Sequence, residues 1–284
     1  MKTDDSAQAE SVHRLSIRLD DKQLFYLQAG SGPPLLLVHG LLGYSFSWRF
    51  AIPALAETAT VYAPDLPGAG FSEPTKEMDC RFRACAERLL RFMDVIGVDD
   101  CNLLGTSHGG AVTMMAAAIA PQRVRKLILV DPVNPWSAHG QTLSLVLSNF
   151  LMAPIFRALT PHLPVLQRFY FQRLFGDTRK IRPGALEGYL TPLHRPGALE
   201  YALGILRSWN QDLRELESIL PRISHIPALL IWGSRDAAVD PASASILKGQ
   251  FRNCQLVMLE GVGHLPYEET PEEFNRVVRE FLVQ

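Results

Sequence analysis

Long apolar runs, cysteine pairs and an excess of charge of one sign are all missing from this chain of 284 residues, and each absence excludes a class of protein. No stretch of about 18 apolar residues occurs, so we expect no membrane-spanning helix and no stable membrane insertion. The four cysteines show neither metal-ligand nor disulfide-framework spacing, which is typical of reduced thiols in a cytoplasmic protein. With a formal net charge of -1 and no basic cluster, neither nucleic acid nor an anionic membrane is an expected partner.

Signatures of a targeting segment, a bound metal and a nucleotide cofactor are also absent. Residues 1–14 are polar and lack the apolar core of a signal peptide, so a cytoplasmic location is expected. The eight histidines form no H-E-x-x-H sequence and no tight cluster with carboxylates, which argues against a metal site. The glycine-rich stretch 67–72 lacks the third glycine of a dinucleotide-binding fingerprint. We therefore expect a protein that works without metal or cofactor.

Continuous apolar runs alternate with helical patterns over most of the chain. Such runs are expected of parallel strands that are buried on both faces. The predicted strands are a hairpin at 16–19 and 23–27, then 34–38, 60–63, 101–105, 126–130, 228–232 and 255–259. The predicted helices cover 81–96, 109–120, 241–249 and 271–282, the last with Thr270, Pro271 and Glu273 arranged as a capping box. This alternation predicts an α/β fold with a doubly wound, mostly parallel sheet.

The segment 134–212 interrupts the alternation. It is rich in proline, leucine and phenylalanine and has no buried-strand pattern. A structureless loop of that length is unusual in a compact domain, so we predict a helical cap inserted after the sixth strand. The core then comprises residues 1–133 and 213–284. Apolar cap side chains such as Phe169 and Phe171 predict an apolar small-molecule substrate and leave self-association into a homo-oligomer open.

The sequence Gly105-Thr106-Ser107-His108-Gly109 follows a predicted strand and opens a predicted helix. This G-x-S-x-G pattern in this context is typical of a nucleophile elbow, in which a sharp strand-to-helix turn exposes the serine hydroxyl above the sheet edge. Glycines flank the serine because the turn leaves no space for Cβ atoms. We therefore predict that Ser107 is a catalytic nucleophile.

A serine hydroxyl needs a base, which is usually a histidine oriented by a carboxylate. Asp236 and His264 each follow a predicted strand, and ligand sites in doubly wound sheets lie at the carboxyl ends of the strands. The chain order Ser107, Asp236, His264 is that of hydrolases built on such a sheet. Asp131 also ends a strand, so it is an alternative acid.

Five motifs in this order resemble the α/β-hydrolase superfamily, in the group of capped Ser/Asp/His hydrolases that includes esterases and meta-cleavage C–C hydrolases. The motifs lie at 37–40 (Leu-Val-His-Gly), 65–72, 105–109, 232–236 and 261–264, and the resemblance covers nearly the whole chain, the segment 134–212 only in kind. It implies an oxyanion hole made by the backbone N–H groups of Leu41 and His108, and it allows the acid at Asp131. The side chains of His39 and Asp65 are expected to brace their loops.

A serine at position 107 excludes the chemistry of haloalkane dehalogenases and epoxide hydrolases, relatives that need a carboxylate there. The predicted activity is hydrolysis of a small or medium apolar carboxylic ester through an acyl-enzyme on Ser107. One alternative is cleavage of a carbon–carbon bond in a vinylogous diketone (a meta-cleavage product), with a cap arginine such as Arg207 binding the substrate carboxylate. The other is a non-catalytic, ligand-binding member of the fold.

Overall fold

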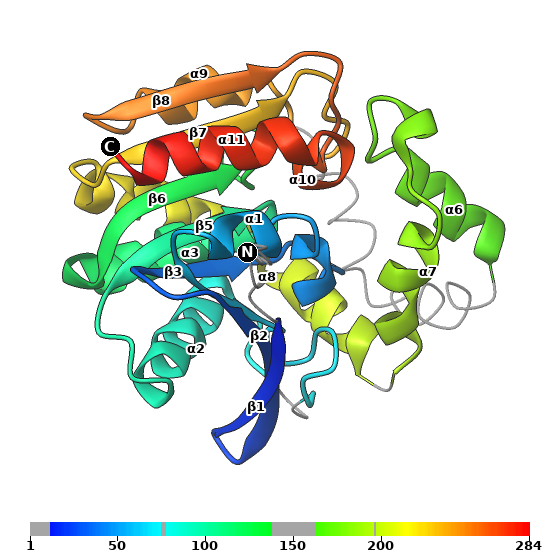
Figure 1. Ribbon diagram of the computed structural model, residues 1–284, viewed down its shortest axis with the longest axis horizontal. Coiled ribbons are helices and arrows are strands. Elements are labelled where there is room, and N and C mark those ends of the chain that lie inside the picture. Colours follow the sequence, from blue (N-terminus) through cyan, green and yellow to red (C-terminus); the bar gives the residue numbers. More distant parts are fainter. Residues whose placement is uncertain (1–11, 75–77, 138–162, 196) are drawn as a thin grey trace, which may run out of the picture.

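A central eight-stranded sheet organises the computed structural model, which describes residues 12–74, 78–137, 163–195 and 197–284. The strand order is β1-β2-β4-β3-β5-β6-β7-β8 (Figure 1). The strands are β1 His13–Leu19, β2 Lys22–Ala29, β3 Pro34–Val38, β4 Thr60–Pro64, β5 Cys101–Thr106, β6 Val124–Val130, β7 Ala228–Gly233 and β8 Cys254–Leu259. The pairs β1–β2 and β2–β4 are antiparallel, and all pairs from β4–β3 to β7–β8 are parallel. The predicted α/β class with a mostly parallel sheet is confirmed.

The burial of each strand follows its side-chain pattern. Strands β5 and β7 are buried along their whole length, because helices cover both faces of the sheet at its centre. Strand β1 is mostly exposed at the edge of the sheet. Its hairpin turn to β2 contains Asp20 and Asp21 with φ angles of 49° and 61°, the left-handed conformation that a two-residue hairpin loop requires.

Two layers of helices enclose the sheet (Figure 1). On one face lie α2 Phe82–Val95, α3 His108–Ile119, the last part of α8 Ala198–Ile223, and α9 Ser243–Lys248. On the other face lie α1 Ile52–Ala56, α10 Pro266–Glu269 and α11 Pro271–Leu282. Each layer buries its own apolar cluster against the sheet, with Trp232 in the first cluster and Trp48 in the second. The core is therefore a three-layer sandwich.

The described part of the predicted cap is helical and contains no strand. It consists of α6 Pro164–Gln172, the short 3-10 turns η4 Thr178–Lys180 and η5 Thr191–His194, α7 Ala185–Leu190 and the beginning of α8. Helices α6 and α7 lie to one side of the sheet, beyond the carboxyl ends of the parallel strands (Figure 1). The rest of the cap prediction concerns residues 138–162 and, like the prediction for the N-terminal residues 1–11, it lies outside the described residues.

Helix α8 spans 26 residues without interruption. The predicted boundary between cap and core, at 212/213, falls inside it. Its first residues face the cap, and Leu216, Ile219 and Ile223 are buried in the core cluster. Among the described helices, none is long and apolar enough to cross a bilayer.

Candidate active site

Ser107 sits at the turn between β5 and α3 in a strained backbone conformation, with φ 52° and ψ -123°. Its N–H donates to the carbonyl of Val130 at 3.0 Å, which ties the turn to the neighbouring strand β6. A Cβ atom on Gly105 would lie 2.5 Å from the carbonyl oxygen of Gly109, and one on Gly109 would overlap the carbonyl oxygen of Val38. Both glycines are therefore required by close backbone approach, as the predicted elbow demands.

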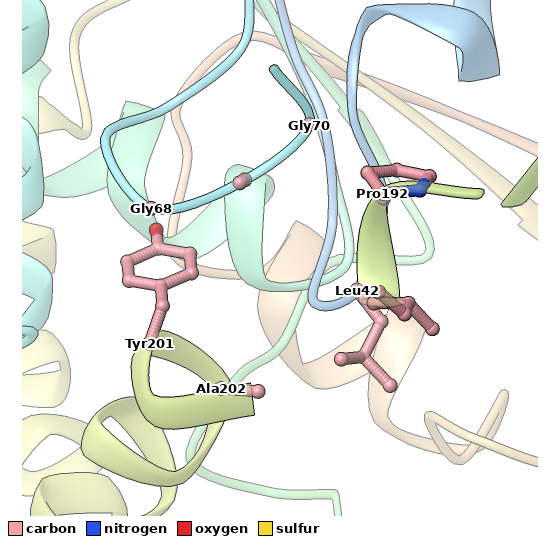
Figure 2. Close-up of a pocket in the computed structure, with 9 residues that line it drawn as sticks. Leu42, Gly68, Gly70, Pro192, Tyr201 and Ala202 are labelled. Carbon is pink, nitrogen blue, oxygen red and sulfur yellow. The ribbon is translucent and has the colours of Figure 1, made fainter. Parts of the chain in front are cut away.

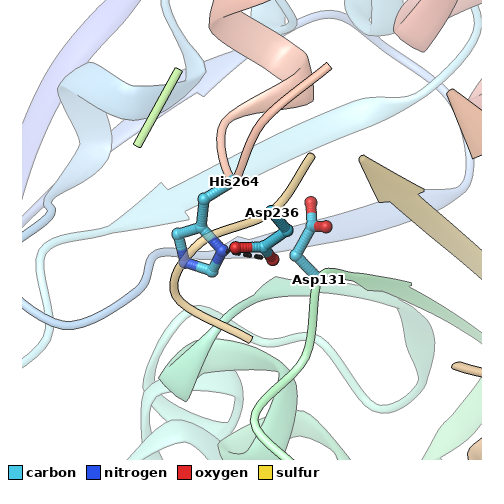
Figure 3. A group of neighbouring side chains, drawn as sticks. All are labelled: Asp131, Asp236 and His264. Atoms are coloured by element: carbon cyan, nitrogen blue, oxygen red, sulfur yellow. Dashed lines mark hydrogen bonds and ion pairs between the residues drawn. The ribbon is translucent and has the colours of Figure 1, made fainter. Parts of the chain in front are cut away.

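Asp236 and His264 are in direct contact (Figure 3). His264 Nδ1 lies 2.8 Å from Asp236 Oδ2, and both side chains are almost fully buried. The other carboxylate oxygen of Asp236 accepts from the backbone N–H groups of Ala238, at 2.7 Å, and Val239, at 3.0 Å. These N–H groups fix the carboxylate, so that it accepts the Nδ1 proton and leaves His264 Nε2 available as a base.

Asp131, the alternative acid, lies beside Asp236 at the end of β6 (Figure 3). Oxygen and nitrogen atoms of Asp131, Asp236 and His264 lie within 4.8 Å of one another. Asp131 is fully buried, with φ 43°, and its Oδ1 accepts from the N–H of Gly233 at 2.9 Å. Burial, followed by the negative charge of Asp236, raises the pKa of Asp131 well above its usual range. Of the two carboxyl groups, Asp236 is the one that contacts the imidazole.

The same three side chains are the one group of potential metal ligands among the residues that the structure describes. Their bonding does not suit a cation. His264 Nδ1 already pairs with Asp236, the second oxygen of Asp236 is held by two N–H groups, and one oxygen of Asp131 accepts from the N–H of Gly233. Metal binding through Nδ1 would need a broken His264–Asp236 contact.

The loop after β3 approaches the elbow closely. A Cβ atom on Gly40 would lie 3.0 Å from the Cβ of Ser107, so the backbone next to Leu41 borders the serine. The His39 ring braces this loop as expected, because Nε2 accepts from the N–H of Leu66 at 3.0 Å and Nδ1 is 2.9 Å from the carbonyl of Gly40. Burial lowers the pKa of His39, consistent with a neutral ring that donates from Nδ1.

The loop that follows β4 is held by Asp65. Its carboxylate accepts from the N–H of Ser45 at 2.8 Å and from the N–H of Phe71 at 2.9 Å. The bracing role expected for Asp65 is thus seen in its contacts, and the first of them joins this loop to the chain that follows Leu41.

His108 is the first residue of α3, where a backbone N–H has no partner within the helix. An N–H in that position can serve an anion at the elbow, which is the role predicted for His108 in an oxyanion hole. The side chain points elsewhere. It is buried edge-on against Phe82 of α2, with ring centroids 5.2 Å apart, and burial lowers its pKa to about 3. The neutral ring is part of the core packing.

A small apolar cavity lies where the two loops meet the cap (Figure 2). Its volume is about 10 Å³. The core loops contribute Leu42, Gly43, Gly68, Ala69 and Gly70, and the cap contributes Pro192, Leu193, Tyr201 and Ala202. The cap thus closes over the loop that carries Leu41, and the space left there is lined by apolar groups.

Sequence reasoning missed two buried acids, Glu268 and Glu269, which come directly after the His264 motif. Both resembled ordinary acids ahead of a helix. The only sign of burial in the sequence was that they lie between the apolar residues 265–267 and Pro271. In the structure this stretch has no exposed polar face. Their contacts link the cap to the core and are described below.

This chain belongs to the α/β-hydrolase fold family, whose model matches residues 33–271. It is 30% identical over 282 residues to the dihydrolipoyllysine-residue acetyltransferase component of the acetoin cleaving system of Pseudomonas putida, covering 98% of this chain and 71% of that protein. It is 29% identical over 258 residues to the pimeloyl-[acyl-carrier protein] methyl ester esterase of Aeromonas hydrophila, covering 89% and 96%. Among solved structures, a bacterial membrane phospholipase A is similar with a TM-score of 0.77 and 28% identity, over 95% of this chain and 86% of that one.

Proposed function

We propose that this protein is a serine hydrolase that cleaves a small or medium apolar carboxylic ester through an acyl-enzyme on Ser107. The observation that carries the proposal is the His264–Asp236 contact of 2.8 Å at the same sheet edge as the strained Ser107 turn. A buried carboxylate on Nδ1 sets the tautomer in which Nε2 is basic. Membership of the hydrolase family supports a hydrolytic reaction, and the ester substrate and the serine route are our inference.

The proposed reaction begins when His264 Nε2 removes the hydroxyl proton of Ser107 and the serine oxygen attacks the ester carbonyl. The negative charge that develops on the carbonyl oxygen is stabilised by the N–H groups of Leu41 and His108. His264 then returns its proton to the leaving alcohol, which yields the acyl-enzyme. Finally, His264 activates a water molecule that releases the acid and restores Ser107.

The expected substrate class follows from the surroundings of the site. The groups that the cap and the loop of Leu41 turn toward each other are apolar, which favours an apolar substrate. Among the similar proteins, one is named as a methyl ester esterase and another as a phospholipase A, and both names denote ester hydrolysis. The name of a further relative denotes transfer of an acetyl group.

The alternatives lead to different expectations. Cleavage of a carbon–carbon bond would use a cap cation for the substrate carboxylate, and the candidate Arg207 is exposed on α8. Among the residues that the structure describes, no contact of Arg207 with the site supports that role. A purely ligand-binding protein would not need the strained serine or the oriented imidazole. The strained backbone of the serine alone costs about 1–3 kcal/mol.

The test is a series of p-nitrophenyl esters of increasing acyl length, measured with the wild type and with Ser107→Ala. We expect turnover of short or medium acyl chains that is lost in Ser107→Ala. Labelling of Ser107 by a fluorophosphonate, followed by mass spectrometry of the peptide, identifies the nucleophile independently of substrate choice. Turnover of a ring-cleavage dienoate but of no ester would establish the carbon–carbon alternative, and an unreactive Ser107 in the folded protein would favour ligand binding.

A further inference from the structure

Two consecutive buried glutamates follow the candidate catalytic histidine. Glu268 is 2% exposed and Glu269 is 5% exposed, both in α10. Burying a carboxylate is costly unless hydrogen bonds replace its hydration, so the partners of each glutamate indicate what the residue is for. The two sets of partners differ.

Glu269 is held by backbone N–H groups from two separate segments. Its Oε1 accepts from Asp177 at 2.9 Å, and its Oε2 accepts from Gly176 at 3.0 Å and from Gly263 at 2.9 Å. Gly263 immediately precedes His264. Gly176 and Asp177 belong to residues 174–177, the cap strap, which follows α6. One carboxylate therefore joins the cap strap to the His264 backbone.

A fourth hydrogen bond completes the junction. The backbone N–H of His264 itself donates to the carbonyl of Leu174 in the cap strap at 2.7 Å. The two segments leave no room between them, because a Cβ on Gly176 would overlap the carbonyl oxygen of Gly261 and one on Gly263 would lie 2.5 Å from the N of Gly176. The backbone of His264 is thus hydrogen-bonded directly to the cap strap.

We propose that Glu269 is a positioning residue for His264, and that its carboxylate and the cap strap together set the imidazole against Asp236. This inference deepens the proposed function and rests on it for the role of His264. Glu269 does not touch the reacting atoms. Its effect passes through the backbone of Gly263 and His264. A change in the position of the cap strap therefore changes the orientation of the His264 imidazole as well.

Glu268 provides a matched control. It is the adjacent residue with similar burial and the same charge, and it also joins the cap to the core. Its carboxylate receives a two-pronged ion pair from Arg49 and a hydrogen bond from the hydroxyl of Tyr189 on α7 at 2.8 Å. These partners are side chains, and none belongs to the His264 loop. Glu268→Gln therefore perturbs the cap contact without altering the histidine backbone.

Three variants test the proposal from both sides of the junction. Glu269→Gln removes the negative charge. It also places an amide N–H₂ group where a carboxylate oxygen accepted from backbone N–H donors. Glu269→Asp keeps the charge but is one methylene too short to reach both segments. Gly176→Ala keeps the carboxylate and forces the cap strap away from Gly261. We expect each to lower kcat by about 100-fold, because misplacing a catalytic group by about 1 Å has that effect, with a smaller change in KM.

The distinguishing readout is the histidine titration. An imidazole ring that loses its close contact with the Asp236 carboxylate holds its proton less firmly. In all three variants the acid limb of the kcat/KM profile should therefore move to lower pH, and NMR of the ring should report the same shift in the His264 titration midpoint. Glu268→Gln should lower the melting temperature and leave this midpoint unchanged.

Two outcomes overturn the proposal. If Glu269→Gln shifts the midpoint but Glu269→Asp and Gly176→Ala do not, Glu269 acts by its charge alone. If the three variants behave like Glu268→Gln, the junction only stabilises the fold. The NMR titration needs no substrate, so it tests the positioning role even if no ester is turned over, and that separate failure would count against the proposed function instead. If a variant does not fold, as judged by near-UV circular dichroism, the other two decide the question.

Discussion

Asp131 and Asp236 form a pair of buried carboxyl groups behind His264, and only Asp236 bonds to the imidazole. The two groups differ in their backbone partners. Asp236 accepts from two N–H groups in addition to the ring, whereas Asp131 accepts from one. Burial and the negative charge of Asp236 raise the pKa of Asp131, which is consistent with Asp236 as the partner of the imidazole.

This division of roles predicts unequal effects of amide substitution. Asp236→Asn should lower kcat about 10³–10⁴-fold, because an amide on Nδ1 favours the wrong tautomer of His264. Asp131→Asn should lower it less than about 10-fold, since Asp131 does not bond to the imidazole and an amide oxygen can still accept from the N–H of Gly233. Steady-state kinetics on the best ester decides the matter, and a larger loss in Asp131→Asn would transfer the acid role to Asp131.

The backbone strain at Ser107 predicts that the free energy of unfolding is higher with glycine at this position than with alanine. A φ of 52° with a ψ of -123° is unfavourable for any residue with a Cβ and open to glycine. Ser107→Gly should therefore be more stable than Ser107→Ala by about 1 kcal/mol, although both lack the nucleophile. Urea denaturation of the two variants gives the difference. Equal stabilities, or a less stable Ser107→Gly, would mean that the turn is not strained in solution.

Asp212 predicts that stability falls as the pH rises. This residue on α8 is fully buried and accepts from the hydroxyl of Ser208 at 2.7 Å, and burial raises its pKa to about 6. The folded protein therefore retains a proton that the unfolded chain has released between pH 4 and pH 6. Below about pH 4 both states are protonated and the ionisation of Asp212 costs no stability; the cost grows through this window and above it stays at no more than about 3 kcal/mol.

Asp212→Asn should remove that dependence, because an amide keeps an acceptor for Ser208 and carries no charge. We expect the variant to be more stable than the wild type at pH 8 and to differ little at pH 4. Denaturant unfolding at the two pH values measures the change. Glu217→Gln, an exposed position on the same helix, serves as the control and should leave the pH dependence as it is.

The sheet could be predicted from sequence because its information is local. The run at 228–232 is apolar throughout, and the structure buries all of β7. The elbow at Ser107 was visible for the same reason, since glycines on both sides report a turn that allows no Cβ atoms. Such features can be recognised from a few neighbouring residues in the sequence.

Features that depend on distant partners could not be predicted. Asp131 and Asp236 both end strands, and their roles are set by loop N–H groups whose directions no pattern reveals. Thr270 was predicted to cap the last helix, but its side chain makes no cap hydrogen bond there and instead donates to the carbonyl of Pro266 at 3.3 Å. Glu269 resembled a solvated acid, and its partners at Gly176 and Asp177 lie more than 90 positions away in the chain.

The continuity of α8 limits how this fold can be recombined. The helix is about 39 Å long if its rise is regular, and it carries the cavity-lining Tyr201 near one end and the core residue Ile223 at the other. If the caps of two relatives were exchanged at residue 212, the junction would fall in the middle of α8. It would join two half-helices whose buried faces are not in register. A graft that ends before Ala198 keeps α8 intact. We therefore expect that substrate specificity can be transferred between relatives by exchanging cap segments that leave α8 with the core.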